Sequence, residues 1–507
     1  MSKHHKLNWR SLHKWGGLIL TFFILMFCLS GIVLNHRKAF VNCQINSRWL
    51  PERYTPSQYN SGIVKGTLRL DGNRLLAYGS AGVWLTDRDF HRFTDYNAGL
   101  PKGIDGRNVS RVVIAKDGRM WCAAQYDLYV HDGKRWVPVP LPGNDERLTD
   151  VALDKDSLQA VALTRSAVYT ASGPDGAFER RYIGTPQGYT SKASLFKTFW
   201  LLHSGALFGL PGRLLVDTVA LVMIFLCFTG IFLFFWPQAI RRTRNKDAVP
   251  HRVAAWKWNR RWHNRLGYYT LVLTLLVTVT GMCLRKPLSA PLAKVKTALV
   301  PVSLQGQHNV WFDKLRGIRW DAQSDRWLVC TSEGFVQADE HFAEAPLQLS
   351  PKQTPKVSAM GVTVWEEERP GEWLVGSFSG LYRWDSATGT VTGWAAGEPA
   401  ASDTPPSGKS KLRVSGYSRD LRTADEVVFD YYKGAPALSP MSGPLTRQAV
   451  PLWRVALDIH VGRFYAPLLG PLSDEFVFFS GLLITVILLS GLAVYYRQRR
   501  RRPGSGE

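Results

Sequence analysis

Five histidines of this 507-residue chain lie at the ends of long apolar segments, where an imidazole is costly to bury and tends to have a function. His13 and His263 lie at the start of the first and third apolar segments, and His203 and His460 precede the second and fourth. His36 follows the first segment. Neutral imidazole is a common axial ligand of haem iron, so the chemistry that these residues allow is electron transfer through bound haem.

The spacing around these histidines repeats in the two halves of the chain. Identical spacings join the arginine, histidine and glycine residues of two motifs, Arg10-x-x-His13 with Gly17 and Ser30-Gly31, and Arg260-x-x-His263 with Gly267 and Thr280-Gly281. A second pair of motifs is His203-x-Gly205 with Asp217 and Thr229-Gly230, and His460-x-Gly462 with Asp474 and Ser490-Gly491. The aspartate follows the histidine by fourteen residues in both motifs, and the spacing from the aspartate to the hydroxyl–glycine pair is four residues longer in the second, about one helical turn. The pattern indicates an internal duplication.

Four apolar segments must position these residues. They run over 16–34, 214–236, 266–284 and 476–496 and approach or reach the length that spans a bilayer. The N-terminus, residues 241–265 and the C-terminus are rich in Lys and Arg, which predicts that all three lie in the cytoplasm. The formal charge of +23 is concentrated at these flanks, and no nucleic-acid motif is present, so we expect no nucleic-acid partner.

This topology predicts two bis-histidine sites in a four-helix core, one near each membrane face. His13 and His263 would hold one haem b at the cytoplasmic face, and His203 and His460 a second at the outer face. Gly17 and Gly267, one turn after the inner histidines, would leave room for the flat macrocycle. The Ser/Thr-Gly pairs would face the two sites. His36 remains open between a spare outer ligand and a simple anchor, because Lys286 occupies the matching position.

Two long segments between the apolar runs show short alternating strands and turns with a period of about forty residues, typical of propeller blades. Roughly three such units are expected in each lobe, so the lobes would form one six-bladed body or two separate β-sandwiches. The fold class is therefore an α+β membrane protein, a four-helix transmembrane bundle with an all-β, propeller-like extracytoplasmic domain formed by two inserted lobes. A disulfide among Cys43, Cys122 and Cys330 is open.

The expected domains follow the chain in order. They are the first transmembrane helix (1–36), the first β lobe (37–198), the second helix with a preceding amphipathic segment (199–240), a basic cytoplasmic loop (241–265), the third helix (266–286), the second β lobe (287–452), the fourth helix with its amphipathic segment (453–497), and a cytoplasmic tail (498–507).

The segment Arg10-Ser11-Leu12-His13-Lys14-Trp15-Gly16-Gly17, with its apolar run and Ser30-Gly31, resembles the PepSY-associated transmembrane family. Leu202-His203-Ser204-Gly205, continuing through Gly212-Arg213 to Thr229-Gly230, resembles it too. The resemblance implies a bacterial inner-membrane di-haem protein that reduces a ferric siderophore in the periplasm, with His13, His263, His203 and His460 at the matching positions. The small PepSY domains usual in the family are absent, which leaves the substrate open.

The leading hypothesis is a transmembrane metalloreductase that passes electrons to a ferric siderophore or another iron chelate in the periplasm. No nucleotide-binding fingerprint is present, so the donor would be a cytoplasmic reductase, reduced flavin or membrane quinol. The alternative is a haem-free, membrane-anchored sensor or scaffold whose lobes bind a periplasmic ligand or protein. A transporter ranks last, because few prolines interrupt the helices.

Overall fold

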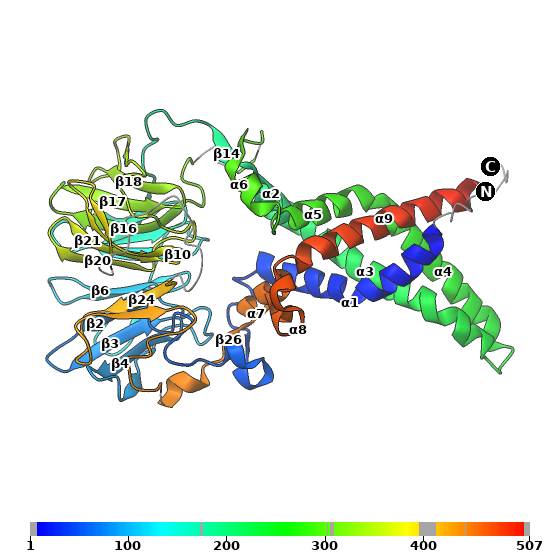
Figure 1. The fold of residues 1–507 in the computed structure, drawn as a ribbon, viewed down its shortest axis with the longest axis horizontal. Coiled ribbons are helices and arrows are strands. Elements are labelled where there is room, and N and C mark those ends of the chain that lie inside the picture. The colour runs from blue at the N-terminus through cyan, green and yellow to red at the C-terminus, as the bar shows by residue number, and fades with distance from the viewer. Residues whose placement is uncertain are drawn as a thin grey trace. The chain divides into compact units, whose positions relative to one another are not determined.

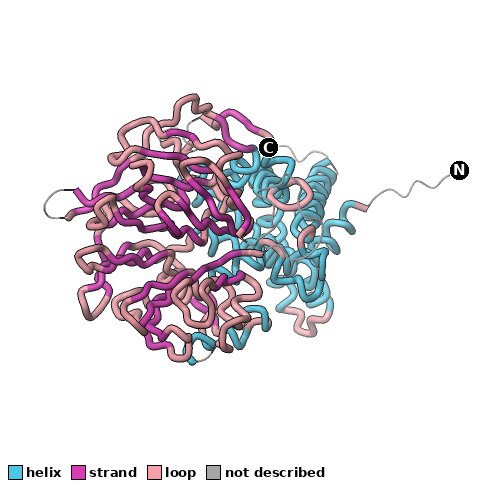
Figure 2. Tube along the Cα trace, turned by 60° about the vertical axis from the view of Figure 1, so that its left-hand side comes forward, coloured by secondary structure: helices cyan, strands magenta, loops and turns pink. Residues whose placement is uncertain are grey.

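The computed structural model describes residues 8–172, 176–301, 303–304, 309–394, 412–441 and 443–500. It divides into two units, each made of segments that are far apart in the sequence (Figure 1). The helical unit comprises Met1–Phe40, Ser191–Gln307 and Leu452–Glu507, and the β unit comprises Val41–Thr190 and His308–Pro451. Figure 2 shows that strands and helices are almost completely segregated between them. The lobes predicted from the sequence, 37–198 and 287–452, are longer than the two segments of the β unit.

The helical unit contains long apolar helices joined to short ones. Its helices are α1 (Trp9–Asn35), α2 (Leu195–His203), α3 (Gly209–Arg241), α4 (Ala248–Tyr269), α5 (Leu271–Cys283), α6 (Ser289–Lys294), α7 (Leu452–His460), α8 (Ala466–Leu469) and α9 (Phe476–Arg500). Helix α1 packs against α3, α7 and α9, and α5 packs against α9. Strands β14 (Lys192–Ser194) and β15 (Lys296–Ala298) pair antiparallel in the same unit. Three helices can span a membrane by length and composition, or four if α4 and α5 count as one span.

The third span differs from the expectation. Residues 266–286 were predicted as one helix and 241–265 as a loop, but α4 extends over most of that loop and meets α5 at a bend of 62°. Helix α4 is held to the last turns of α3, because the Trp236 indole donates to the Arg252 carbonyl (3.0 Å) and the Arg252 guanidinium donates to the Thr243 hydroxyl (2.8 Å). Arg, Lys and Ala are strong helix formers, so a basic segment need not be a loop. Residues 501–507 of the predicted tail lie outside the described part of the chain.

The β unit is built from antiparallel sheets that follow one another along the chain. Among the described residues, five sheets have four strands and one has two, all in sequential order. Their strands are β2 (Gly66–Arg69), β3 (Arg74–Gly79), β4 (Gly82–Asp87), β5 (Phe93–Asp95); β6 (Arg111–Ile114), β7 (Met120–Ala123), β8 (Leu128–His131), β9 (Trp136–Val139); β10 (Leu148–Leu153), β11 (Ala160–Thr164), β12 (Val168–Ser172), β13 (Ala177–Arg181); β16 (Leu315–Asp321), β17 (Arg326–Thr331), β18 (Gly334–Ala338), β19 (Leu347–Gln348); β20 (Val364–Arg369), β21 (Glu372–Ser377), β22 (Gly380–Asp385), β23 (Val391–Gly393); β24 (Val414–Ser418) and β25 (Val427–Asp430). A further pair joins β1 (Gln44–Ile45) to β26 (Val450–Pro451).

The hydrophobic core of the β unit lies between consecutive sheets rather than within one sheet. Each buried cluster combines side chains of two neighbouring sheets, and no sheet closes on itself. The pairs that represent the clusters are Leu76 with Val112, Val113 with Val151, Val161 with Ile318, Cys330 with Trp365, Val364 with Val414, and Leu75 with Phe429. The last pair joins the sixth sheet to the first, so the packing of the sheets returns to its starting point.

The cysteines do not form disulfides. All six are free thiols, including Cys43, Cys122 and Cys330. Cys122 and Cys330 lie in two different core clusters, between the first and second sheets and between the fourth and fifth. Burial raises the pKa of the Cys330 thiol to about 12, so it packs as a small apolar residue.

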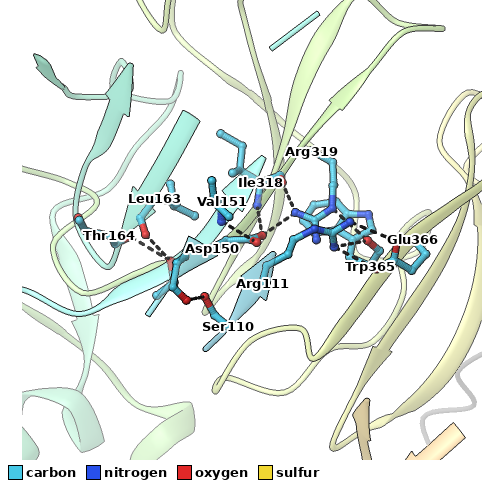
Figure 3. Close-up of polar contacts among 12 residues, drawn as sticks. Ser110, Arg111, Asp150, Val151, Leu163, Thr164, Ile318, Arg319, Trp365 and Glu366 are labelled. Atoms are coloured by element: carbon cyan, nitrogen blue, oxygen red, sulfur yellow. Dashed lines mark hydrogen bonds and ion pairs between the residues drawn. The ribbon is translucent and has the colours of Figure 1, made fainter. Parts of the chain in front are cut away.

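Buried ion pairs join the two lobes inside the β unit (Figure 3). Arg319 of β16 donates to the Asp150 carboxylate of β10 (2.7 Å) and to the carbonyl of Trp365 (3.0 Å). Arg111 of β6 donates to the same carbonyl and forms a two-pronged pair with Glu366 of β20 (3.1 and 3.2 Å). Glu366 therefore belongs to a strand and has a buried cationic partner. The network ties strands of the first lobe, β6 and β10, to strands of the second.

Replacing Arg319 by Met should destabilise the β unit strongly, because the Asp150 carboxylate would stay buried without its cation. Breaking one partner of a buried pair costs about 3–5 kcal/mol. The matched control is Lys155→Met, which breaks the exposed Lys155–Glu340 pair (2.7 Å) and should cost about 0–1 kcal/mol. Thermal unfolding followed by tryptophan fluorescence measures both, and equal midpoints for the two variants would contradict the role given to this network.

Candidate functional site

The structure brings the predicted inner histidines together. The rings of His13 on α1 and His263 on α4 lie edge to face, with centroids 6.2 Å apart. His13 Nδ1 is hydrogen-bonded to the Ile487 carbonyl (3.0 Å) and the Ser490 hydroxyl (3.2 Å) of α9. His263 Nδ1 is hydrogen-bonded to the Thr229 hydroxyl of α3 (2.8 Å). Each ring is therefore fixed by a helix other than its own.

The outer histidines form a second pair of the same design. The rings of His203, the last residue of α2, and His460, the last residue of α7, have centroids 5.9 Å apart. His203 Nδ1 is hydrogen-bonded to the Val277 carbonyl of α5 (2.9 Å). His460 Nδ1 is hydrogen-bonded to the Ser30 hydroxyl (3.0 Å) and the Phe27 carbonyl (3.2 Å) of α1. The sequence repeat thus becomes two equivalent pairs in space.

These hydrogen bonds determine which ring nitrogen carries the proton. A carbonyl oxygen can only accept, so Nδ1 of His13, His203 and His460 must be the donor. For His263 the partner is a hydroxyl, but Thr229 already donates its proton to the carbonyl of Phe225 (2.8 Å), four residues earlier, and so must accept from His263. In a neutral imidazole with a proton on Nδ1, Nε2 keeps its lone pair. Each pair therefore has two Nε2 lone pairs, on rings whose centroids lie 6.2 Å (His13–His263) and 5.9 Å (His203–His460) apart.

The glycines of the Ser/Thr-Gly pairs allow each imidazole ring to lie close to the backbone of a facing helix. A Cβ at Gly281 would lie 2.5 Å from His203 Cε1, and one at Gly491 would lie 2.9 Å from His13 Cε1. At Gly31 and Gly230 the nearest atoms are Cε1 of His460 (3.4 Å) and of His263 (3.7 Å). In every case the hydroxyl residue precedes a glycine on which the imidazole edge rests. The glycine lets the ring lie against the helix backbone. At Ser30, Thr229 and Ser490 the residue before the glycine also presents its hydroxyl to the ring.

Gly17 and Gly267 have a different environment. A Cβ at Gly17 would lie 4.0 Å from Ile487, and one at Gly267 would lie 3.9 Å from Leu226, which are ordinary van der Waals contacts. The packing of the protein alone therefore does not require glycine at either position. Their suggested role, leaving room for a macrocycle, stays a prediction.

The structure places His36 in a separate site. His36 Nε2 lies 2.5 Å from Asp217 Oδ2 on α3, and the Asn35 amide donates to the other carboxylate oxygen (3.2 Å). In the second half, Lys286 takes the place of His36 and forms an ion pair with Asp474 (2.9 Å). The two acids therefore tether the outer ends of the helices that carry the repeat.

The two acids are not structurally equivalent, although each follows its histidine by fourteen residues. Gly209 (φ 64°, ψ −142°) and Gly470 (φ 55°, ψ −133°) have the same unusual backbone conformation, just before the long helices of each half. Helix α8 (Ala466–Leu469) is inserted before Gly470 and supplies the four extra residues of the second motif. The insertion therefore precedes Asp474 rather than following it.

Each pair stands without a third metal ligand. In the described part of the chain, the one group of three His, Cys, Asp or Glu side chains close enough to share an ion is Asp87, Asp89 and His91 in the β unit. A bare zinc ion usually needs at least three protein ligands, so it does not suit two imidazoles alone. The residues would fit an iron held in a macrocycle, which needs only two further ligands from the protein.

Sequence reasoning missed the backbone acceptors and one buried amide. The carbonyls of Ile487, Val277 and Phe27 each precede the Ser/Thr of the repeated pair by three residues, and no residue type signals a carbonyl. Asn259, buried on α4, donates to the Thr229 carbonyl (3.0 Å) and fixes the helix segment that binds His263. Its place four residues before His263 is the only signal that could have found it.

Comparison with known proteins identifies the family. The model for the PepSY-associated TM region matches residues 10–499, and the chain belongs to this family. The chain is thus a membrane protein embedded in a lipid bilayer. No curated protein matches the sequence.

Two solved structures are similar to part of the chain. They are the extracellular domains of a hybrid two-component system and of a one-component system from B. thetaiotaomicron, each with 10% identity and TM-scores of 0.35 and 0.34. Each match covers 73% of this chain and 32% of the other, so the chain spans about a third of their length. Nothing about the function of this chain follows from so distant a likeness.

Replacing Thr229 by Val should release the His263 ring, because the Thr229 hydroxyl is the hydrogen-bond acceptor shown for its Nδ1. A buried donor left without a partner costs about 1–3 kcal/mol. Ser490→Ala is the matched control, because the Ile487 carbonyl still accepts from His13. Nitrogen NMR of histidine-labelled protein should show a mixed tautomer for one residue in the Thr229 variant and an unchanged spectrum in the control. A single Nδ1–H tautomer in both variants would contradict the assignment.

Proposed function

We propose that the chain is a transmembrane electron carrier that holds two haem b groups, one between His13 and His263 and one between His203 and His460. The observation that supports this most directly is that each pair presents two Nε2 lone pairs from rings 6.2 and 5.9 Å apart. A bond of about 2 Å from each imidazole nitrogen to a metal accounts for that separation. The hydrogen bonds to Nδ1 orient the rings and raise their basicity as ligands.

Buried apolar side chains fill the interior of the helical bundle. Leu20 and Ile24 of α1 pack with residues of α3 and α9 in one buried cluster, which also contains Met223, Cys227, Ile484 and Ile487. On α1, Leu20 and Ile24 lie between His13 of the inner pair and Ser30, which is hydrogen-bonded to His460 of the outer pair. Haem bound at the two sites would supply one-electron redox chemistry. The apolar cluster would keep water and protons out of the path between them.

The proposed reaction is the reduction of a ferric siderophore or another iron chelate. Hard oxygen ligands hold ferric iron, and the reduced ion binds them more weakly, so one electron releases the metal. The Lys- and Arg-rich flanks support an orientation with both termini and α4 on the cytoplasmic side of a bacterial inner membrane and the β unit in the periplasm. Electrons would come from a cytoplasmic reductase, a reduced flavin or a quinol.

The β unit is proposed to be one six-bladed propeller to which each lobe contributes three blades. The cyclic packing of the six sheets supports this, because the cluster around Leu75 and Phe429 joins the last sheet to the first. The buried network of Arg319, Asp150, Arg111 and Glu366 supports one body rather than two sandwiches, because it crosses between the lobes.

The purified chain should show the Soret band of a low-spin, bis-histidine haem at two haems per chain. His13→Ala and His203→Ala should each remove about half of the band, and the double variant should remove all of it. His91→Ala, in the β unit, is the control and should leave the spectrum unchanged. A colourless wild-type protein, or a double variant with the full band, would overturn the proposal. A haem-free protein that co-purifies with a periplasmic partner would instead support an anchored sensor.

In proteoliposomes with a reductant sealed inside, the chain should reduce a ferric chelate added outside. The rate should fall at least tenfold in both single histidine variants, since a gap at either site breaks the path. Absorbance of a ferrous-specific indicator in the outer solution measures the rate, with empty liposomes as the control. Reduction that persists without either haem would show that the path does not pass through the histidine pairs.

A further inference from the structure

We propose that His36 and Asp217 form a proton-exchange site that serves the outer histidine pair. This inference rests on the proposed electron transfer. When the outer centre gains an electron, His36 takes up a proton from the outer water, and it returns that proton when the electron leaves for the chelate. One electron thus moves with a compensating proton, and no other reactant is needed.

The geometry of the site defines the atom that exchanges. Asp217 accepts from His36 Nε2 (2.5 Å) and from the Asn35 amide (3.2 Å), so both carboxylate oxygens are held. Because a carboxylate can only accept, His36 Nε2 carries a hydrogen, and Nδ1 is the nitrogen that gains or loses a proton. The His36 side chain is 31% exposed and Asp217 is 12% exposed. The acid is therefore more shielded than the imidazole.

The position of the site places it within electrostatic range of the outer pair. Ser30 holds His460 from α1, and His36 lies six residues further along, roughly 9 Å along the helix axis. Charges at such a distance interact appreciably in a partly buried environment, where screening by salt is weak. An added electron at the outer pair therefore favours the imidazolium form of His36.

The internal repeat supplies the comparison that separates this role from simple tethering. Lys286 occupies the position of His36 and pairs with Asp474 (2.9 Å), with Arg285 also near (3.7 Å). Lysine keeps its charge throughout the neutral range, so this half holds a fixed ion pair. A tether needs only the ion pair, which Lys provides. The first half keeps an ionic contact in the His36–Asp217 pair, and its imidazole can also accept or release a proton.

The surroundings of His36 contain charges of both signs, and none of them is a second imidazole–acid pair. Asp458 of α7 is paired with Arg463 (3.0 Å), and the Arg37 guanidinium lies over the Trp453 ring (3.7 Å). The charged and titratable groups at this end are Arg37 and Lys38, which follow α1, Arg213 and Asp217 of α3, and Arg454, Asp458 and His460 of α7.

The first measurement is a spectroscopic redox titration of the haem-loaded chain at several pH values. The second is the proton uptake on reduction, which an indicator dye reports in weak buffer. In the wild type, the midpoint potential of one haem should fall as pH rises, and reduction should take up protons. His36→Lys, which copies the second half, should lose both effects while keeping the Soret band. Lys286→Gln breaks the other tether and should keep both.

The outcomes distinguish this inference from the proposed function. A wild-type protein with two haems whose potentials do not vary with pH would overturn the proton-exchange site and leave electron transfer standing. Equal loss of pH dependence in the His36→Lys and Lys286→Gln variants would show that the two pairs act only as tethers. Absence of haem would remove the proposed function itself.

Discussion

The helical unit depends on one repeated hydrogen bond, from an imidazole Nδ1–H to a carbonyl or hydroxyl oxygen on a facing helix. The membrane interior offers no water, so a buried N–H must find a protein acceptor. The Ser/Thr hydroxyl meets this need because it donates to its own helix and keeps its lone pairs for the ring, as Ser30 and Thr229 do. Each such bond also joins two helices. The two His pairs therefore cross-link the bundle, and the same bonds fix the orientation of their rings.

The β unit is stabilised mainly by contacts between neighbouring sheets. Its sheets share their core with their neighbours, so neither lobe can bury its end sheets alone. The charges of Arg319 and Arg111 are buried where the two lobes meet, and acids from the other lobe neutralise them. Buried pairs of this kind add little stability compared with apolar packing, but they penalise any wrong register. The ion pairs thus specify how the lobes pair, and the aromatic and aliphatic clusters hold them together.

Much of the site could be predicted from the sequence, because the duplication repeats the same histidine and glycine spacings in both halves of the chain. His13 with His263 and His203 with His460 follow from spacing alone, and the family is confirmed by the match over residues 10–499. The bend at Thr270 could not be predicted, because composition marks apolar length and not direction. His36 was ambiguous, because its partner Asp217 is 181 residues away. The four-residue insertion was placed on the wrong side of Asp474, because equal spacing to the histidine concealed the inserted turn of α8.

The cyclic order of the sheets has a consequence for how the protein is made. The first sheet meets the sixth around Leu75 and Phe429, and these residues belong to the two different insertions. During synthesis the first lobe is made well before the second, because α3, α4 and α5 lie between them in the chain. In that interval its first and third sheets expose faces that only later strands will cover. Transiently uncovered strands and apolar faces are prone to aggregation. Half of the β unit must therefore remain incomplete until the last third of the chain has been translated.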